Sequence, residues 1–268
     1  MTIKGFVINR FSGDGVALDG FSTMTGDVVT QNYIGTDVTG ATSLGNGDAG
    51  FYVDGGTSLY ISQLTLSSNI IADSGTINAA AGVGIALNNA SNVVIAGNAI
   101  GTSAAESAAL ANAGGIEINN SSSVTIGGLS ANNANIISGN TNYGLGIFNS
   151  STGVLVEGNY IGTNTANSTA LANGSYGIEI SGASSNTIGG TTASARNIIS
   201  GNTSLGIYIT GASTNGNLVE GNYIGTNIAG TGVLANGSSG IAVNAGATNT
   251  TIGGATAAAS NTVGGNAA

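Results

Sequence analysis

The sequence predicts an all-β chain wound as a parallel β-helix, or β-solenoid, of about eight turns. Each turn is expected to span about 31 residues and to hold three short strands. Three observations predict this fold: a Gly-apolar-x-apolar box recurs at nearly constant spacing, Gly and Asn interrupt every apolar segment, and no stretch has the period of an amphipathic helix. We interpret residues 1–268 as one solenoid domain, a fragment of a longer repeat protein.

The first strand of each turn is expected at the Gly-apolar-x-apolar box. Consecutive boxes lie 29 to 35 residues apart. Because side chains alternate between the two faces of a strand, the apolar positions would point inward and the x position outward. No single turn can bury its own apolar side, so the turns must stack. The boxes begin at Gly15, Gly50, Gly84, Gly115, Gly146, Gly177, Gly206 and Gly240.

The second and third strands are marked by boxes that alternate between turns. Asn-x-Ile-Gly-Thr begins at Asn32, Asn98, Asn159 and Asn222. The turns between carry Thr-Ile-Gly-Gly and Asn-Ile-Ile-Ser-Gly-Asn, so the true period is two turns, about 63 residues. Gly and Asn tolerate the left-handed backbone that a corner requires, and Asn side chains are expected to form ladders at the corners. These boxes begin at Thr125 and Asn135, at Thr187 and Asn197, and in weaker form at Thr251 and Asn261.

Two kinds of insertion distinguish the turns. In one kind, eight residues separate the Thr of the third strand from a Leu, which predicts a loop that folds back and pins that Leu to the body; the four leucines are Leu44, Leu110, Leu171 and Leu234. In the other kind, the insertion separates the second strand from the third. Residues 60–78 fit the repeat poorly.

Composition excludes several classes of protein. The net charge is −9 with only three basic residues, Lys4, Arg10 and Arg196, so no nucleic-acid partner is expected. No apolar run approaches the roughly 18 residues of a membrane span, so no membrane insertion is expected. The absence of Cys excludes disulfides and thiolate metal sites.

These repeats resemble those of the pectate-lyase-like superfamily of parallel β-helix proteins. The Asn-Thr-Ile-Gly-Gly segment at Asn186 and the Gly-Asn-x-Ile-Gly-Thr segment at Gly158 are similar to repeats in large bacterial secreted and surface proteins. The resemblance covers nearly the whole chain and implies a right-handed helix in an extracellular or cell-surface protein. It does not imply one function, because the superfamily includes lyases, hydrolases, epimerases, tailspikes and adhesins.

The sequence favours a protein that is not an enzyme. Lyases and hydrolases of that superfamily would imply clustered Asp, or Ca²⁺-binding carboxylates beside a basic residue. The basic residues here are far apart in sequence, and there is no His to act as acid or base. No cofactor is expected. Seven Asp gather in the first turns, which indicates turn chemistry, with a Ca²⁺ site in these acidic N-terminal turns as the alternative: Asp14, Asp19, Asp27, Asp37, Asp48, Asp54 and Asp73.

One outward stripe is a candidate ligand-binding surface. The x positions of the first strand are predicted to alternate acid and aromatic residues on adjacent turns, an arrangement suited to sugar rings, which have an apolar face and a polar rim. Simple cross-strand packing of aromatic residues is the alternative interpretation. The candidate binding residues are Tyr52, Glu117, Phe148, Glu179 and Tyr208.

A second outward stripe belongs to the third strand. It is an apolar ladder that the loop leucines are expected to cover, with an open contact surface as the alternative. Its members are Tyr33, Ala99, Ile136, Tyr160, Ile198 and Tyr223.

The leading functional hypothesis is a non-catalytic extracellular stalk or adhesion module with a polysaccharide as its ligand. A second hypothesis is a filament subunit that associates with itself through the solenoid ends, since no amphipathic cap helix is visible at either end. A third is a polysaccharide lyase, hydrolase or epimerase.

Overall fold

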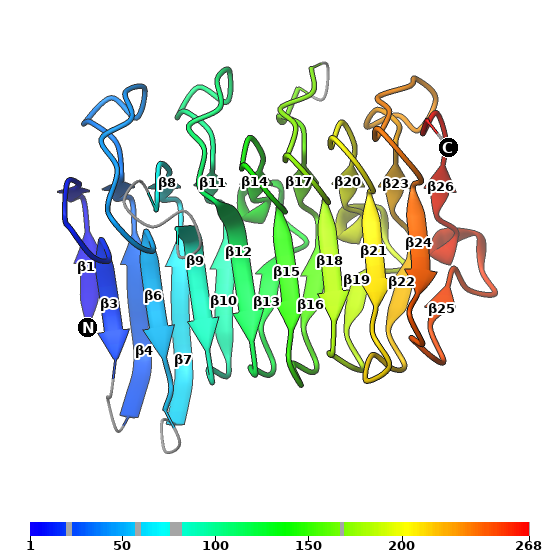
Figure 1. Ribbon diagram of the computed structural model, residues 1–268, viewed down its shortest axis with the longest axis horizontal. Coiled ribbons are helices and arrows are strands. Elements are labelled where there is room, and N and C mark those ends of the chain that lie inside the picture. Colours follow the sequence, from blue (N-terminus) through cyan, green and yellow to red (C-terminus); the bar gives the residue numbers. More distant parts are fainter. Residues whose placement is uncertain (20–22, 57–59, 76–81, 167–168, 268) are drawn as a thin grey trace.

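The computed structural model describes residues 1–19, 23–56, 60–75, 82–166 and 169–267, and these form a stack of short strands in three parallel sheets (Figure 1). Sheets A and B each have nine strands and sheet C has eight. Each strand inside a sheet pairs in parallel with the equivalent strands one turn before and one turn after it, as a β-helix requires, and the terminal strands pair on one side. The predicted order of three strands per turn is therefore confirmed.

The strands of the three sheets have the following bounds. Sheet A consists of β1 (Thr2–Lys4), β4 (Thr23–Thr30), β7 (Tyr60–Ser67), β10 (Val93–Ala96), β13 (Thr125–Gly127), β16 (Leu155–Glu157), β19 (Thr187–Gly189), β22 (Leu218–Glu220) and β25 (Thr251–Ile252). Sheet B consists of β2 (Val7–Ile8), β5 (Tyr33–Ile34), β8 (Ile70–Ile71), β11 (Ala99–Ile100), β14 (Ile136–Ile137), β17 (Tyr160–Ile161), β20 (Ile198–Ile199), β23 (Tyr223–Ile224) and β26 (Thr262–Val263). Sheet C consists of β3 (Val16–Asp19), β6 (Phe51–Asp54), β9 (Val83–Asn88), β12 (Gly114–Asn119), β15 (Leu145–Phe148), β18 (Ile178–Ser181), β21 (Ile207–Thr210) and β24 (Ile241–Asn244).

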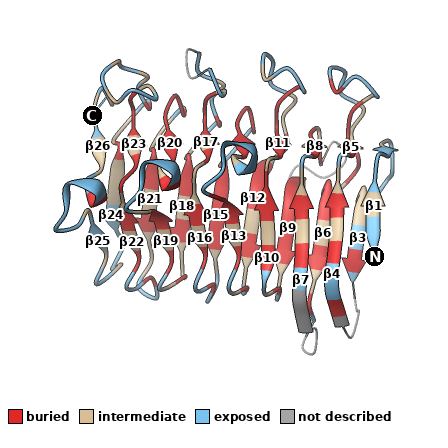
Figure 2. Ribbon diagram, turned by 180° about the vertical axis from the view of Figure 1, so that it is seen from behind, coloured by how far each residue is buried: buried red, intermediate tan, exposed pale blue. Residues whose placement is uncertain are grey.

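The core is a column of mainly aliphatic side chains enclosed by the three sheets. The strands in the middle of the rod are accordingly coloured as buried along much of their length (Figure 2). In a middle turn, Val156 of sheet A, Ile161 of sheet B and Ile180 of sheet C are each fully buried. Burying such a side chain stabilises the fold by roughly 1.5–3 kcal/mol. Because the same three inward positions repeat in each turn, this stabilisation recurs along the rod.

A ladder of asparagine side chains runs along the corner that precedes sheet B. Each side-chain amide nitrogen donates to the amide oxygen of the next asparagine at 2.9–3.0 Å. The same nitrogen also donates to a backbone carbonyl of the preceding turn, as Asn159 does to Ile126 at 2.8 Å. The ladder supplies partners to polar groups that are otherwise removed from water. Its members are Asn32, Asn69, Asn98, Asn135, Asn159, Asn197, Asn222 and Asn261.

A second asparagine ladder follows the corner between sheets B and C. Its side-chain amides are joined at 2.9–3.0 Å in the same head-to-tail manner. The expectation of corner ladders is thus confirmed at two corners. The members of this ladder are Asn112, Asn140, Asn173, Asn202, Asn236 and Asn266.

The two insertions lie where the spacing predicted them. The loop after the third strand closes with antiparallel bridges such as Thr163 to Ala170, and loops of this kind project from one edge of the rod (Figure 1). Leu171 is held through its backbone, whose N–H donates to Gly162 and whose carbonyl accepts from Gly139, while its side chain is only half-buried. The other insertion contains a 3₁₀ turn: η1 (Ala131–Asn133), η2 (Ala193–Ala195) or η3 (Ala257–Ala259).

The segment that fits the repeat poorly still provides regular strands. β7 takes its place in sheet A and β8 its place in sheet B. The sequence pattern is obscured because β4 and β7 are each eight residues long and pair with register shifts around Thr25, and both extend past the other strands of the sheet (Figure 1). The remaining part of this segment, residues 76–78, lies outside the described residues.

We predict that replacing Asn159 by Ala lowers the free energy of unfolding by about 3 kcal/mol, because several buried polar partners in the neighbouring turns would lose their hydrogen bonds. Its side chain is fully buried, donates to Ile126 and Asn197, and accepts from Asn135. Urea denaturation measures the change. The control is Asn142→Ala, at an exposed position, which should change the value by less than about 0.5 kcal/mol. Equal effects of the two substitutions would contradict a stabilising role of the ladder.

Candidate functional site on the outer face of sheet C

The outward stripe of sheet C differs in one turn from the stripe that the sequence predicted. Glu117 lies beside Gly146, and Gly146 lies beside Glu179, whereas Phe148 pairs with Asn119 and Ser181. The box of this turn therefore begins at residue 144, not at Gly146. The expected alternation of acid and aromatic residues was wrong at Phe148, which belongs to the neighbouring stripe. Along the corrected stripe the outward residues are Ala17, Tyr52, Ala86, Glu117, Gly146, Glu179, Tyr208 and Ala242.

Two aromatic rings cover the place that a side chain at Gly146 would take. The rings of Tyr143 and Phe148 meet edge to face, with centroids 5.5 Å apart and planes at 79°. A Cβ on Gly146 would lie 2.3 Å from the Phe148 ring and 3.1 Å from the Tyr143 ring. The absence of a side chain at Gly146 therefore leaves room for this aromatic pair to pack over the strand.

The Tyr143 hydroxyl donates to a carboxylate oxygen of Glu117 at 2.6 Å. Burial of the ring and this hydrogen bond raise the pKa of the Tyr143 phenol above its ordinary value. Glu117 and Tyr143 are thus held as a fixed acid–phenol pair on the sheet surface.

A second aromatic pair lies beside the first. Tyr176 precedes β18 at the position that Tyr143 occupies before β15, and its ring lies 4.8 Å from the ring of Tyr208. Glu179 lies in β18, beside Tyr208 of β21. Its side chain is half-buried, and burial raises the pKa of its carboxyl. Three consecutive turns of sheet C consequently carry aromatic rings, with Glu117 on the turn before them and Glu179 on the middle one.

A shallow groove of about 290 Å³ adjoins the aromatic pairs toward the N-terminus. Its polar lining is acidic, with the carboxylates of Asp14, Asp48 and Glu117, and Tyr52 provides an aromatic wall. The Asp14 carboxylate accepts from the backbone of Ala49 at 2.9 Å. Burial, together with the nearby charge of Asp48, raises the pKa of Asp14. The groove and the two aromatic pairs form one continuous strip, which we call the sheet C face.

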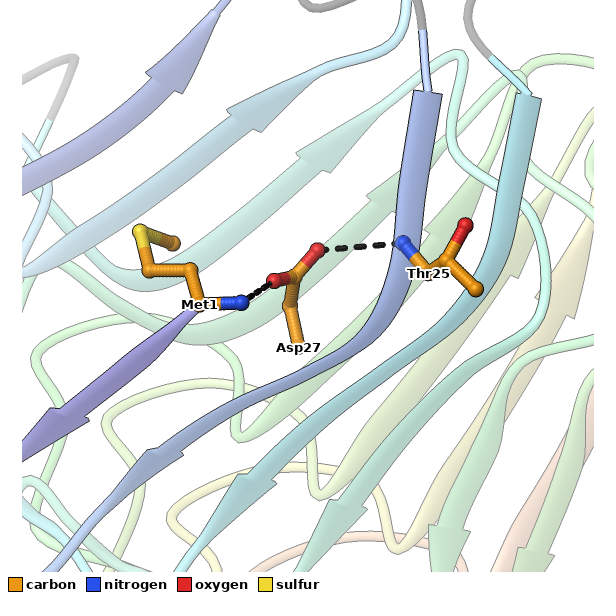
Figure 3. A network of polar contacts seen from close by, with 3 residues as sticks. All are labelled: Met1, Thr25 and Asp27. Atoms are coloured by element: carbon orange, nitrogen blue, oxygen red, sulfur yellow. Dashed lines mark hydrogen bonds and ion pairs between the residues drawn. The ribbon is translucent and has the colours of Figure 1, made fainter.

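Several of the early acids accept hydrogen bonds within turns or from neighbouring turns. Asp37 accepts four hydrogen bonds within its own loop, and these lower its pKa to about 2. Asp27 accepts from the N-terminal ammonium of Met1 and, at 3.1 Å, from the backbone N–H of Thr25 (Figure 3). Asp73 accepts from Gly45 at 2.7 Å. Among the described residues, no group of three or more Asp, Glu, His or Cys is arranged to hold a metal ion.

Four of the five predicted binding residues lie on the corrected stripe, and Phe148 lies beside it. Sequence reasoning missed Tyr143 and Tyr176, although both precede a Gly-apolar-x-apolar box. The repeat of Tyr-Gly-apolar at these two positions was the available signal. It was overlooked because the box was placed two residues too late in the turn of Tyr143.

The predicted stripe on sheet B is confirmed in its register but is largely covered. Tyr160 lies between Ile136 and Ile198 on neighbouring strands. The two isoleucines are buried, and loop glycines approach other members of the stripe: a Cβ on Gly40 or Gly230 would lie 2.9 or 2.8 Å from a tyrosine ring. The stripe is therefore mainly a satellite core, although loop backbone and not leucine side chains provides these contacts.

Comparison with known proteins identifies the family. Residues 1–193 match the family described as the right-handed β-helix region. The chain belongs to this right-handed β-helix family. The handedness expected from the resemblance is therefore confirmed. A search of curated proteins found no match to this β-helix. Among the described residues, no helix has the length and apolar character needed to cross a membrane.

A solved structure with the same architecture is the A-module of the mannuronan C-5 epimerase AlgE4 from Azotobacter vinelandii. The TM-score is 0.52 and the sequence identity 16%, over 98% of the β-helix described here and 64% of that chain. This structural likeness shows a shared fold and leaves the activity open.

We predict that Tyr143→Phe lowers the free energy of unfolding at neutral pH. The variant should also lose less of this free energy than the wild type when the pH is raised above about 10. The substitution removes the hydrogen bond to the Glu117 carboxylate, which lowers the free energy of unfolding by about 1–2 kcal/mol. Above about pH 10 the unfolded chain releases a phenolic proton that the folded protein retains, because the folded pKa is the higher one. Its free energy of unfolding should then fall by an extra ~1.4 kcal/mol per pH unit.

Denaturant unfolding of both proteins between pH 8 and pH 11 measures this difference. Ionisation of the other tyrosines is common to both proteins and cancels. The stability gap should be constant below about pH 10 and narrow above it. A gap that stays constant to pH 11 would show that the Tyr143 phenol ionises as readily in the folded protein as in the unfolded chain.

Proposed function

We propose that this β-helix is a non-catalytic module that binds an uncharged polysaccharide along the sheet C face. The observation that carries the proposal is the succession of two aromatic pairs on consecutive turns, Tyr143 with Phe148 and Tyr176 with Tyr208. Successive turns of a β-helix are about 4.8 Å apart, so the rings form a rigid strip parallel to the long axis of the rod. An extended glycan can follow such a strip over several sugar rings.

The chemistry of the strip suits sugars. An aromatic ring offers an apolar surface to the C–H face of a pyranose. Glutamate carboxylates and tyrosine phenols accept hydrogen bonds from the hydroxyls of the sugar. Glu117 lies on the turn before the first aromatic pair, and Glu179 lies between Gly146 and Tyr208. Both carboxylates supply such acceptors. Most of these groups are half-buried and fixed by neighbours, which limits the conformational entropy lost on binding.

The charge of the face favours an uncharged glycan over a polyuronate. The strip and its groove carry the carboxylates of Asp14, Asp48, Glu117 and Glu179, and none of the residues that line the groove is basic. A polyuronate chain would meet like charges along its length. The substrate named for the epimerase A-module is mannuronan, which is a polyuronate. The ligand proposed here therefore differs from it although the fold is shared.

The same charges support a binding rather than a catalytic role. Lyase and epimerase chemistry on a uronate removes the proton next to a carboxylate, and a cationic group is needed to stabilise the charge that develops. Lys4, Arg10 and Arg196 are the only basic side chains of the chain, and none lines the sheet C groove. An extracellular or cell-surface location is part of the proposal, because long glycans are displayed there.

We predict that Tyr176→Ala and Tyr208→Ala each weaken glycan binding roughly tenfold, since one stacked ring contributes about 1.4 kcal/mol. A panel of soluble neutral and uronate glycans, measured by titration calorimetry, tests the effect. The control Phe11→Ala removes an exposed aromatic ring outside sheet C and should leave binding unchanged. Tight binding of uronates, turnover of any glycan, or indifference to both tyrosine substitutions would overturn the proposal.

Self-association is a second candidate function, supported by exposed apolar side chains on the terminal turns (Figure 2). Ile252 and Val263 at the C-terminal end are each 49% exposed, although the positions paired with them in the preceding turn, Val219 and Ile224, are fully buried. Another turn stacked on this end would cover them.

We predict for this alternative that Ile252→Lys with Val263→Lys abolishes end-to-end association, because stacking would bury both charges without partners. Electron microscopy and sedimentation over a range of concentrations provide the readout. The control Val233→Lys changes a side chain that is 71% exposed on a loop. Single short rods at every concentration for the wild type would exclude the filament.

A further inference from the structure

A groove of about 440 Å³ lies on the opposite side of the rod, over sheet B. The 3₁₀ turns η1 and η2 form its two sides, and Tyr160 of β17 lies between them. Arg196 also lines the groove and is the one charged residue among the lining residues that the structure describes. Leu129 and Ile228 stand at its rim with 56% and 51% of their surfaces exposed. This groove is distinct from the sheet C face and is independent of the glycan proposal.

The groove exists because one repeat has a small residue where the next has a large one. Arg196 immediately precedes Asn197 of the first asparagine ladder, and Ala134 holds the same position before Asn135. In the later repeat, the Arg196 guanidinium covers the ring of Tyr223 at 4.0 Å, and its Nε donates to the carbonyl of Gly221 at 3.1 Å. In the earlier repeat, Ala134 is too short to cover Tyr160, and the equivalent space stays open.

The open groove offers the same surroundings that hold Arg196 one repeat later. Tyr160 and Gly158 in the groove correspond to Tyr223 and Gly221 beside Arg196. A guanidinium stacked on a tyrosine face gains about 0.5–2 kcal/mol from the attraction of the cation to the ring. The protein itself thus demonstrates which group fits this site.

A carboxylate is positioned next to the groove. Glu106, from the loop two turns earlier, accepts from the backbone N–H and the hydroxyl of Thr165 at 2.9 and 2.6 Å, and Thr165 lines the groove. Burial and the negative charge of the nearby Glu106 together raise the pKa of the Tyr160 phenol. The net charge of −9 adds a general attraction for cations.

We infer that the Tyr160 groove binds an arginine side chain of a partner polypeptide. The guanidinium would stack on Tyr160 within reach of Glu106, and the methylene stem would lie against Leu129 and Ile228. A polypeptide is favoured over a free guanidino compound because the apolar rim is exposed and continues beyond the space that one guanidinium fills.

The test uses the whole chain with ring-labelled tyrosine and NMR. The probes are the blocked tripeptide Gly-Arg-Gly, its citrulline analogue, which has the same shape without the charge, its lysine analogue, and methylguanidine. The arginine peptide should shift the Tyr160 ring signals saturably and bind at least tenfold more tightly than the citrulline and lysine peptides. Molar salt should weaken its binding severalfold.

Four variants separate the groove from general effects. Ala134→Arg should abolish binding, since the new side chain would cover Tyr160 as Arg196 covers Tyr223, whereas Ala134→Ser, which copies Ser260 of the third repeat, should retain it. Glu106→Gln should weaken binding about tenfold. Arg196→Ala should uncover Tyr223 and create a second site, which raises the stoichiometry from one to two.

Several results would overturn the inference. Equal binding of the arginine and citrulline peptides would remove the role of charge. Unchanged binding by Ala134→Arg, with the fold verified by circular dichroism, would place the site elsewhere. Methylguanidine binding as tightly as the tripeptide would assign the groove to a small guanidino compound. Tyr160 signals that no probe moves would exclude a guanidinium site.

Discussion

The hydrogen bond between asparagine side chains of successive turns is the interaction on which the architecture depends. A parallel β-helix must turn sharply three times in each turn, and the corners interrupt the backbone ladder that the strands maintain. At two corners the buried asparagine amides bridge adjacent turns at 2.9–3.0 Å. An amide both donates and accepts, so it can be repeated indefinitely with every member satisfied. Aspartate could not form such a ladder, because it cannot donate and its charges would repel.

The asparagine ladders also fix the register of the outer surface. Once an asparagine is aligned with its equivalents, each residue of the strands is aligned with one residue in the next turn. Insertions are therefore restricted to positions between strands, where loops and 3₁₀ turns leave the core unchanged. The same constraint places Tyr143 and Tyr176 on one line and Gly146 between Glu117 and Glu179.

The two long faces differ because the insertions lie beside only one of them. In the part of the chain that the structure describes, both kinds of insertion lie outside sheet C, so its strip presents aromatic rings and carboxylates at the surface. Sheet B is flanked by 3₁₀ turns on one side and loops on the other, which cover most of its apolar stripe. Contacts between loops extend over two turns, as from Glu106 to Thr165. An opening remains where Ala134 replaces the large residue of the next repeat. Small changes between repeats can thus create a site in a regular scaffold without altering its fold.

The sequence by itself determined the three strands per turn, the two-turn period and the place of each insertion. These follow from local rules: alternation of side chains in a strand, left-handed backbone at Gly and Asn, and the need to stack turns that cannot bury an apolar side alone. It also placed Tyr52, Glu117, Glu179 and Tyr208 on one stripe. Only the tertiary structure decided that Phe148 belongs to the neighbouring stripe, because Gly144-Leu145 and Gly146-Ile147 both offer the Gly-apolar start of a box and the pairing with adjacent turns selects the first. The ring of Tyr143 over Gly146, the pairing of Tyr176 with Tyr208 and the groove above Tyr160 depend on side chains from different turns, and the distances between turns are set by stacking rather than by sequence spacing.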